Sequence, residues 1–144
     1  MNATFMVAVD GSDGSRRAAQ FATERARREG GALLLVHVVD WSPYDPVVPQ
    51  DMGSRHLDRD AEIDRAQSDL LDPLVERLQS EGLEISCVVR HGHVAETLSS
   101  LAEERGVTQI FTGRRGRSRL AALIFGSVAS TLVQVATVPV TVVP

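Results

Sequence analysis

Lysine is absent from this chain of 144 residues, in which all 15 basic side chains are arginine. The absence excludes every mechanism that needs a lysine amine, such as phosphate binding by a Walker A lysine or Schiff-base chemistry. The single cysteine, Cys87, excludes an internal disulfide and a zinc site with several cysteine ligands. No run of 18 apolar residues is present, which excludes a transmembrane helix. The first residues carry no positive charge ahead of an apolar stretch, so we expect no signal peptide and a cytoplasmic protein.

The two signs of charge are unevenly distributed along the chain. Residues 40–84 hold 12 acidic and four basic side chains, whereas residues 105–144 hold five arginines and no acidic side chain. The formal net charge of −4 makes the protein a poor candidate for nucleic-acid binding. The local positive charge near the end of the chain could hold a small anion.

Five apolar segments rich in strand-forming residues alternate with four segments of helical periodicity. The expected strands cover residues 5–9, 32–39, 83–90, 107–112 and 138–143. The expected helices cover residues 15–29, about 57–81, about 94–102 and 127–136. Regular alternation of this kind favours an α/β fold with a parallel sheet covered by helices on both faces. No linker divides the chain, so we expect a single domain over residues 1–144.

Two features of the middle of the chain need explanation. Pro73 lies inside the helical pattern and predicts a kink or a break. The segment 40–56 contains three prolines and is long for a connection. It also holds Trp41 and Tyr44, so it could be a lid over a ligand, a docking site for a partner, or a solvated charged loop.

The loops that follow the strands are the expected place for a ligand, because open α/β sheets bind ligands beyond the carboxyl ends of their strands. Gly113 and Gly116 flank two arginines directly after a strand, and Gly126 precedes an expected helix. Glycines allow a backbone to approach a ligand closely, and a helix start attracts anions. The Ser127 hydroxyl could cap this helix or bind a phosphate oxygen. An ordinary turn, a solvated basic loop and a simple helix cap would explain the same residues.

The histidines and the cysteine suggest no metal or redox site. His91 and His93 would supply only two ligands, with no third histidine or cysteine nearby, so we expect no metal. His37 lies in an apolar segment and is expected to be a hydrogen-bonded core histidine. Cys87 lies in an expected strand and is predicted to be an inert core residue.

No arrangement typical of a catalytic nucleophile is present. Asp10 lacks the second acid two residues later that an aspartyl phosphotransferase uses, because Ser12 stands there. Asp13 is better placed to begin the first helix, where its charge suits the helix dipole. No general base is positioned beside an activated nucleophile, and we therefore expect no catalytic residue.

The spacing Gly113-x2-Gly116-x9-Gly126-Ser127 resembles the nucleotide-binding signature of universal stress proteins. Residues 7–12, 34–39 and 138–142 resemble the first, second and last strands of that family. The resemblance covers nearly the whole chain, and the glycine spacing is its most specific part.

The resemblance implies a doubly wound, Rossmann-like five-stranded parallel sheet with strand order 3-2-1-4-5, similar to the adenine nucleotide alpha hydrolases. It implies an ATP site between the first and fourth strands, in which Mg²⁺ could accompany the ATP. It also implies a homodimer formed through Val138 to Val143. The nucleotide-binding residues that it implies are Ala8, Val9, Asp10, Val38, Thr112, Gly113, Arg115, Gly116, Gly126, Ser127, Val128 and Ala129. Asp10 would hold the ribose, backbone groups of Val38 would meet the adenine, and the glycine segments would hold the phosphates.

The chain departs from the family pattern at three positions. Thr108 stands where the family often has aspartate, Gln109 where it has an aliphatic residue, and Arg114 where it has a small one. The first two could loosen the start of the fourth strand. The glycine signature itself is intact, which favours the ATP-binding branch of the family.

We therefore expect a cytoplasmic, homodimeric module that binds ATP and regulates a stress response through an unidentified protein partner, without nucleic acid or membrane insertion. Two alternatives stay open. The chain could be an interaction protein of the same fold that carries no nucleotide, or a slow ATP hydrolase.

Overall fold

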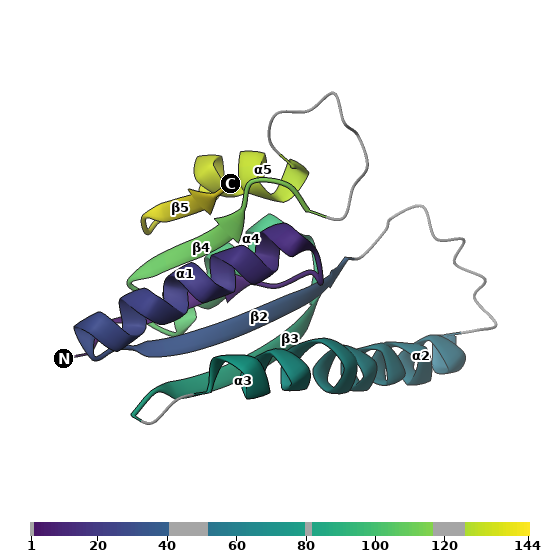
Figure 1. The fold of residues 1–144 in the computed structure, drawn as a ribbon. Helices are drawn as coiled ribbons and strands as arrows, with labels where there is room; N and C mark the ends of the chain where they lie inside the picture. The colour runs from purple at the N-terminus through teal and green to yellow at the C-terminus, as the bar shows by residue number, and fades with distance from the viewer. Residues whose placement is uncertain (1, 41–51, 80–81, 117–125) are drawn as a thin grey trace.

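The sheet has five parallel strands in the order β3-β2-β1-β4-β5, and this order confirms the expectation (Figure 1). The computed structural model describes residues 2–40, 52–79, 82–116 and 126–144. The strands are β1 (Thr4–Ala8), β2 (Ala32–Asp40), β3 (Glu84–Gly92), β4 (Gln109–Gly113) and β5 (Val140–Val143). The strand β1 lies at the centre, where Val7 pairs with Leu35 on one side and Phe111 on the other.

Helices cover both faces of the sheet, as expected for this fold (Figure 1). The helical segments are α1 (Asp13–Glu29), α2 (Met52–Arg65), η2 (Ala66–Leu71), α3 (Asp72–Leu78), α4 (Val94–Glu104) and α5 (Ser127–Val135). Buried residues of α1, η2 and α3 pack on one face, and those of α4 and α5 pack on the other. No helix in the described parts of the chain is long and apolar enough to cross a membrane.

The two core clusters arise from the alternation of side chains along each strand. Leu33 and Leu35 of β2 point to the face covered by α1, whereas Leu34 and Val36 point to the face covered by α4. Both faces are buried, which explains why the strands appear in the sequence as continuous apolar runs. Phe5 and Phe111 are the largest fully buried side chains, and their rings meet edge to face in the α1 layer with centroids 5.7 Å apart.

The helical segment before β3 differs from the prediction. It begins at Met52 rather than near Leu57, and its last helical residue is Leu78. The kink or break predicted at Pro73 takes the form of a π-helical stretch, η2, in which the Asp72 N–H donates to the Gln67 carbonyl five residues earlier. Pro73 then lies in the first turn of α3. Helical dihedrals continue through Leu71, so Pro73 interrupts a continuous helix, and a π-helical stretch is one of the recognised forms of such an interruption.

The start of α1 is capped by a side chain. The Ser12 hydroxyl accepts a hydrogen bond from the Ser15 N–H at 3.2 Å, an interaction typically worth about 1 kcal/mol of helix stability. Asp13 occupies the first turn, as predicted, and the Arg16 guanidinium beside it lowers the pKa of its carboxyl group. Gly30 ends the helix with a left-handed φ of 67°.

Hydrogen bonds fix the start of β4 despite its departures from the family pattern. The Thr108 hydroxyl accepts from the Thr4 N–H at 3.2 Å, and the Thr108 N–H donates to the Thr4 carbonyl at 2.8 Å. The Gln109 amide donates to the Thr141 hydroxyl on β5. These bonds join the start of β4 to both neighbouring strands, and a loosening by the two departures stays a prediction.

We expect Phe5→Ala to lower the free energy of unfolding by about 3–5 kcal/mol, because it empties a fully buried position. The matched control is Phe21→Ala. Phe21 also contacts Phe111, with ring centroids 5.9 Å apart, but Phe21 is 45% exposed. Its substitution should therefore lower the free energy of unfolding by only about 1 kcal/mol. Urea denaturation followed by circular dichroism measures both. Equal losses would contradict the core assignment.

Candidate functional site

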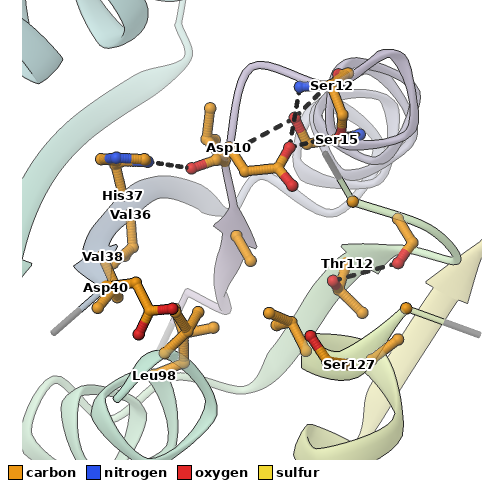
Figure 2. A pocket seen from close by; sticks show the side chains of 18 of the residues that line it. Asp10, Ser12, Ser15, Val36, His37, Val38, Asp40, Leu98, Thr112 and Ser127 are labelled. Carbon is orange, nitrogen blue, oxygen red and sulfur yellow. Dashed lines mark hydrogen bonds between the residues drawn. The ribbon is translucent and has the colours of Figure 1, made fainter. Parts of the chain in front are cut away.

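A pocket with a cavity volume of about 360 Å³ lies at the carboxyl edge of the sheet (Figure 2). Its size is in the range of small-molecule sites. It is lined by the ends of β1, β2 and β4 and by the starts of α1, α4 and α5. The structure brings together in this pocket all twelve predicted residues, which are Ala8, Val9, Asp10, Val38, Thr112, Gly113, Arg115, Gly116, Gly126, Ser127, Val128 and Ala129.

Glycines bring the loop after β4 against the start of α1. A methyl group on Gly113 would lie 2.7 Å from the carbonyl carbon of Gly14, and one on Gly14 would lie 2.7 Å from the Arg115 oxygen. Real Cβ atoms do not approach backbone atoms this closely, so neither position has space for a side chain. Close packing of two backbones, without any ligand, is therefore sufficient to require glycine at both positions.

Asp10 is held at the centre of the pocket by the start of α1 (Figure 2). Its Oδ1 accepts from the Ser12 N–H at 2.9 Å and from the Ser12 hydroxyl, while its own N–H donates to the Ser15 hydroxyl at 3.3 Å. A methyl group on Gly116 would lie 2.7 Å from Oδ2 of Asp10. All of the hydrogen bonds that the described residues make to this carboxylate go to Oδ1, so Oδ2 is left to accept from a ligand.

The start of α5 forms one end of the pocket. Gly126, and not Ser127, occupies the N-cap position, and no side chain caps the helix, so the capping role predicted for Ser127 is wrong. The Gly126 N–H donates to the Arg114 carbonyl at 2.7 Å. The N–H groups of the first turn have no acceptor within the helix, and the helix dipole adds partial positive charge. Together with Arg115, this end of the pocket favours an anion.

The opposite end of the pocket is apolar. It is formed by Val36 and Val38 of β2 and by Val94 and Leu98 of α4. Of these residues, only Val38 was predicted from the sequence. Five further residues line the pocket and were not predicted, namely Ser12, Ser15, His37, Val39 and Asp40. The period of two along β2 could have indicated Val36, whereas the α4 residues become visible only once the topology is known.

His37 is hydrogen-bonded, as predicted, but it is not a core residue. Its Nδ1 lies 2.6 Å from the Val9 carbonyl oxygen, and its ring is half-buried at the edge of the pocket (Figure 2). The Val9 N–H in turn donates to the Val36 carbonyl at 2.8 Å. The ring therefore helps to fix the backbone immediately before Asp10.

No metal centre can be built from the parts of the chain that the structure describes, because they contain no group of three or more potential ligands from histidine, cysteine, aspartate or glutamate. His91 lies with Nε2 3.4 Å from the Arg59 carbonyl oxygen. Cys87 is half-buried on β3 rather than fully within the core. Burial raises the pKa of its thiol, against a smaller opposite effect of a hydrogen bond from Gln67, and a protonated thiol is a poor nucleophile.

Several predictions concern residues that lie outside the described residues. The lid or docking role of Trp41 and Tyr44 is among them, as are Arg117 and Arg119 of the basic loop. The other two arginines of that loop, Arg114 and Arg115, are described and exposed.

The profile of the universal stress protein family matches residues 1–144. The chain belongs to this family. It is 28% identical over 145 residues to universal stress protein YxiE of Bacillus subtilis, covering 96% of each chain. Its fold is similar to that of universal stress protein UspA from Lactobacillus plantarum, with a TM-score of 0.83, 23% identity, and coverage of 99% of this chain and 97% of that chain.

Two universal stress proteins of similar fold have been solved with a nucleotide. One, from Archaeoglobus fulgidus, is in complex with dAMP, and matches with a TM-score of 0.60 and 23% identity over 100% of this chain and 98% of that chain. The other is in complex with cAMP, and matches with a TM-score of 0.62 and 22% identity over 99% of this chain and 97% of that chain. Some members of the family thus bind adenine nucleotides.

We expect Gly113→Ala to destabilise this universal stress protein by about 1–3 kcal/mol in the absence of any nucleotide, because its methyl group would collide with the backbone of Gly14. Thermal unfolding of the nucleotide-free protein measures the loss. The control is Ser127→Ala, which alters an exposed pocket residue without a collision and should change stability by less than about 0.5 kcal/mol. A Gly113→Ala variant as stable as wild type would overturn the packing role of this glycine.

Proposed function

We propose that this chain is a regulatory module, one domain over residues 1–144, that binds ATP in the pocket at the carboxyl edge of the sheet. The observation that carries the proposal is the polarity of that pocket. It offers an apolar end at β2 and α4, a carboxylate in the middle, and an end at α5 that favours anions. The parts of a nucleotide follow the same order: an apolar base, a sugar whose hydroxyls can donate to a carboxylate, and anionic phosphates. The dAMP and cAMP complexes of related proteins support the adenine base.

In this proposal each part of ATP lies against the lining residues that can bind it. The base lies between Val38 and the apolar side chains of α4, and the ribose hydroxyls donate to the free Oδ2 of Asp10. The phosphates meet the backbone of Gly113 and Gly116, the Arg115 guanidinium, and the first turn of α5. Mg²⁺ would arrive with the phosphates, which commonly supply its ligands together with water.

The backbone contacts favour one competing function. Because Gly14 and Gly113 need to be glycine for packing alone, the signature is also compatible with an interaction protein that carries no nucleotide. Binding measurements distinguish the two functions directly.

We expect the nucleotide-stripped protein to bind ATP with Mg²⁺ at micromolar affinity, about −8 kcal/mol, in a calorimetric titration. Gly126→Asp should abolish binding, because it places a negative charge at the start of α5. The matched control is Gly126→Ala, which introduces the same Cβ, 3.1 Å from the Gly116 nitrogen, without the charge and should retain binding.

Thermal unfolding provides the second readout, since a ligand that binds only the folded state raises the melting temperature. No heat and no stabilisation of the wild-type protein by ATP would contradict the proposal and favour the interaction protein. Loss of binding in both Gly126 variants, with both folded, would contradict the electrostatic role assigned to α5.

We further propose a homodimer formed through Val138 to Val143. The strand β5 lies at an edge of the sheet, where unpaired backbone groups can pair with another strand. A mostly apolar hollow beside it is lined by Val133, Val142 and Pro144, among others, and Val133 is 55% exposed. Exposed apolar surface next to a free strand edge suits contact between two copies.

Val133→Glu should weaken this dimer, because it places a charge in the apolar hollow. Gln134→Glu adds the same charge one residue away, at an exposed polar position of α5, and should leave the dimer intact. Sedimentation velocity across a range of protein concentrations measures the association of both variants. A wild-type protein that is monomeric throughout, or equal effects of the two substitutions, would rule out this interface.

Regulation would follow if ATP binding ordered the loop after β4 and shifted the contacts of the dimer or of a protein partner. The identity of that partner and the cytoplasmic location stay predictions.

A further inference from the structure

The strand β3 forms the edge of the sheet opposite β5 (Figure 1). Within the described residues it pairs with β2 along its whole length and with no strand on its other side. An edge strand leaves a row of backbone N–H and carbonyl groups that can pair with another strand. The outer side of β3 is therefore a candidate surface for strand addition.

The strand β3 has few of the features that protect an edge. Natural edges are blunted by lysine, proline, bulges or a very short strand. This strand has nine residues, contains neither lysine nor proline, and keeps an uninterrupted register with β2 from Glu84 to Gly92. None of its residues is fully buried, although Ile85, Val88 and Val89 are apolar. Apolar side chains are thus left half-exposed along an open edge.

The two faces of β3 differ in chemistry. Ile85 and Val89 pack against the layer formed by α1, η2 and α3. Glu84 and Arg90 lie on the opposite face with Val88, which packs in the α4 layer, because alternate residues of a strand share a face. Both charged residues are exposed. The strand therefore carries a negative charge at its start and a positive charge near its end, on the same face.

Arg90 has one ionic neighbour within its own copy. Its guanidinium lies 3.8 Å from a carboxylate oxygen of Glu104, and the two side chains are 45% and 61% exposed. An exposed ion pair of this kind contributes little to stability. The guanidinium is therefore available to a carboxylate of another chain.

Two-fold symmetry limits how two copies of β3 can pair. A symmetric contact that continues the sheet joins the two strands antiparallel, and side chains directly opposite each other share a face. Such a pairing is therefore centred on one residue. The register centred on Cys87 places Glu84 opposite the partner's Arg90, and symmetry makes this pair twice. Every other symmetric register places the two charges opposite uncharged residues or opposite themselves.

We propose that β3 is an interaction surface for a second copy of this chain, which pairs with it antiparallel in the register centred on Cys87. Ile85 then lies opposite the partner's Val89 on the other face, where β-branched side chains pack well. The opposite charges fix a register that the apolar side chains alone would leave open. This contact lies at the other edge of the sheet from the one proposed at β5, and it does not depend on a nucleotide.

Charge reversal in a Val133→Glu background tests the register, because that substitution is designed to weaken the contact at β5. In sedimentation velocity over a range of concentrations, the background protein should still associate. Glu84→Arg and Arg90→Glu should each weaken this association about tenfold or more, because two pairs of opposite charge become two pairs of like charge. An equimolar mixture of the two variants should regain the background affinity, because each mixed dimer again pairs opposite charges.

The control is Glu24→Arg, which makes the same change of charge at an exposed residue of α1, a helix that packs chiefly on β1 and β4. It should leave the association unchanged. Mixing two variants alters no contact within either chain, so recovery in the mixture does not come from a change in folding. Circular dichroism verifies that each variant is folded.

Three outcomes would overturn the proposal. They are a background protein that is monomeric at every concentration, charge-reversal variants that associate as well as the background, and a mixture that associates no better than its two components. Each concerns the β3 edge alone, so ATP binding and the contact at β5 are tested separately.

Discussion

The pocket depends on the contact between two backbones, those of Gly14 at the start of α1 and Gly113 at the end of β4. A single methyl group at either position would lie 2.7 Å from the opposing backbone. Because the two segments meet without side chains between them, the loop after β4 is drawn over the start of α1, and Gly116 comes to lie against the Asp10 carboxylate. The loop then meets the cap of α5, where the Gly126 N–H donates to the Arg114 carbonyl. Both the central carboxylate and the start of α5 border the resulting cavity.

The polarity of the pocket follows from the strand order. Because β2 and β4 lie on opposite sides of β1, their ends contribute different chemistry to the two ends of one cavity. The β2 end is lined by side chains of the α4 layer, which are apolar because they belong to the core. The β4 end is built largely of glycines and helix N–H groups, which are polar because no side chain covers them. A ligand with an apolar part and an anionic part is therefore oriented before any specific hydrogen bond is made.

Much of this arrangement could be predicted from the sequence, and the remainder depended on contacts between distant residues. The alternation of apolar runs and helical patterns predicted the element order, and the resemblance to universal stress proteins supplied the strand order and the twelve residues that meet in the pocket. The start of α2 was missed because residues 52–56 contain a glycine and show no apolar period. Val94 and Leu98 were missed because only the packing of α4 on the sheet brings them beside β2. The start of α5 at Ser127 was predicted, but capping by the Ser127 hydroxyl, one of the two roles considered for it, is wrong because Gly126 occupies the N-cap.

The shortness of α5 has a mechanical consequence. The helix has nine residues, so it is about 13 Å long. Its first turn lines the pocket, and Val133, less than two turns later, lines the hollow beside β5. Backbone hydrogen bonds join successive turns of so short a helix, so they set the position of one end relative to the other. The pocket and the hollow beside β5 are thus joined by one short helix, which contributes residues to both.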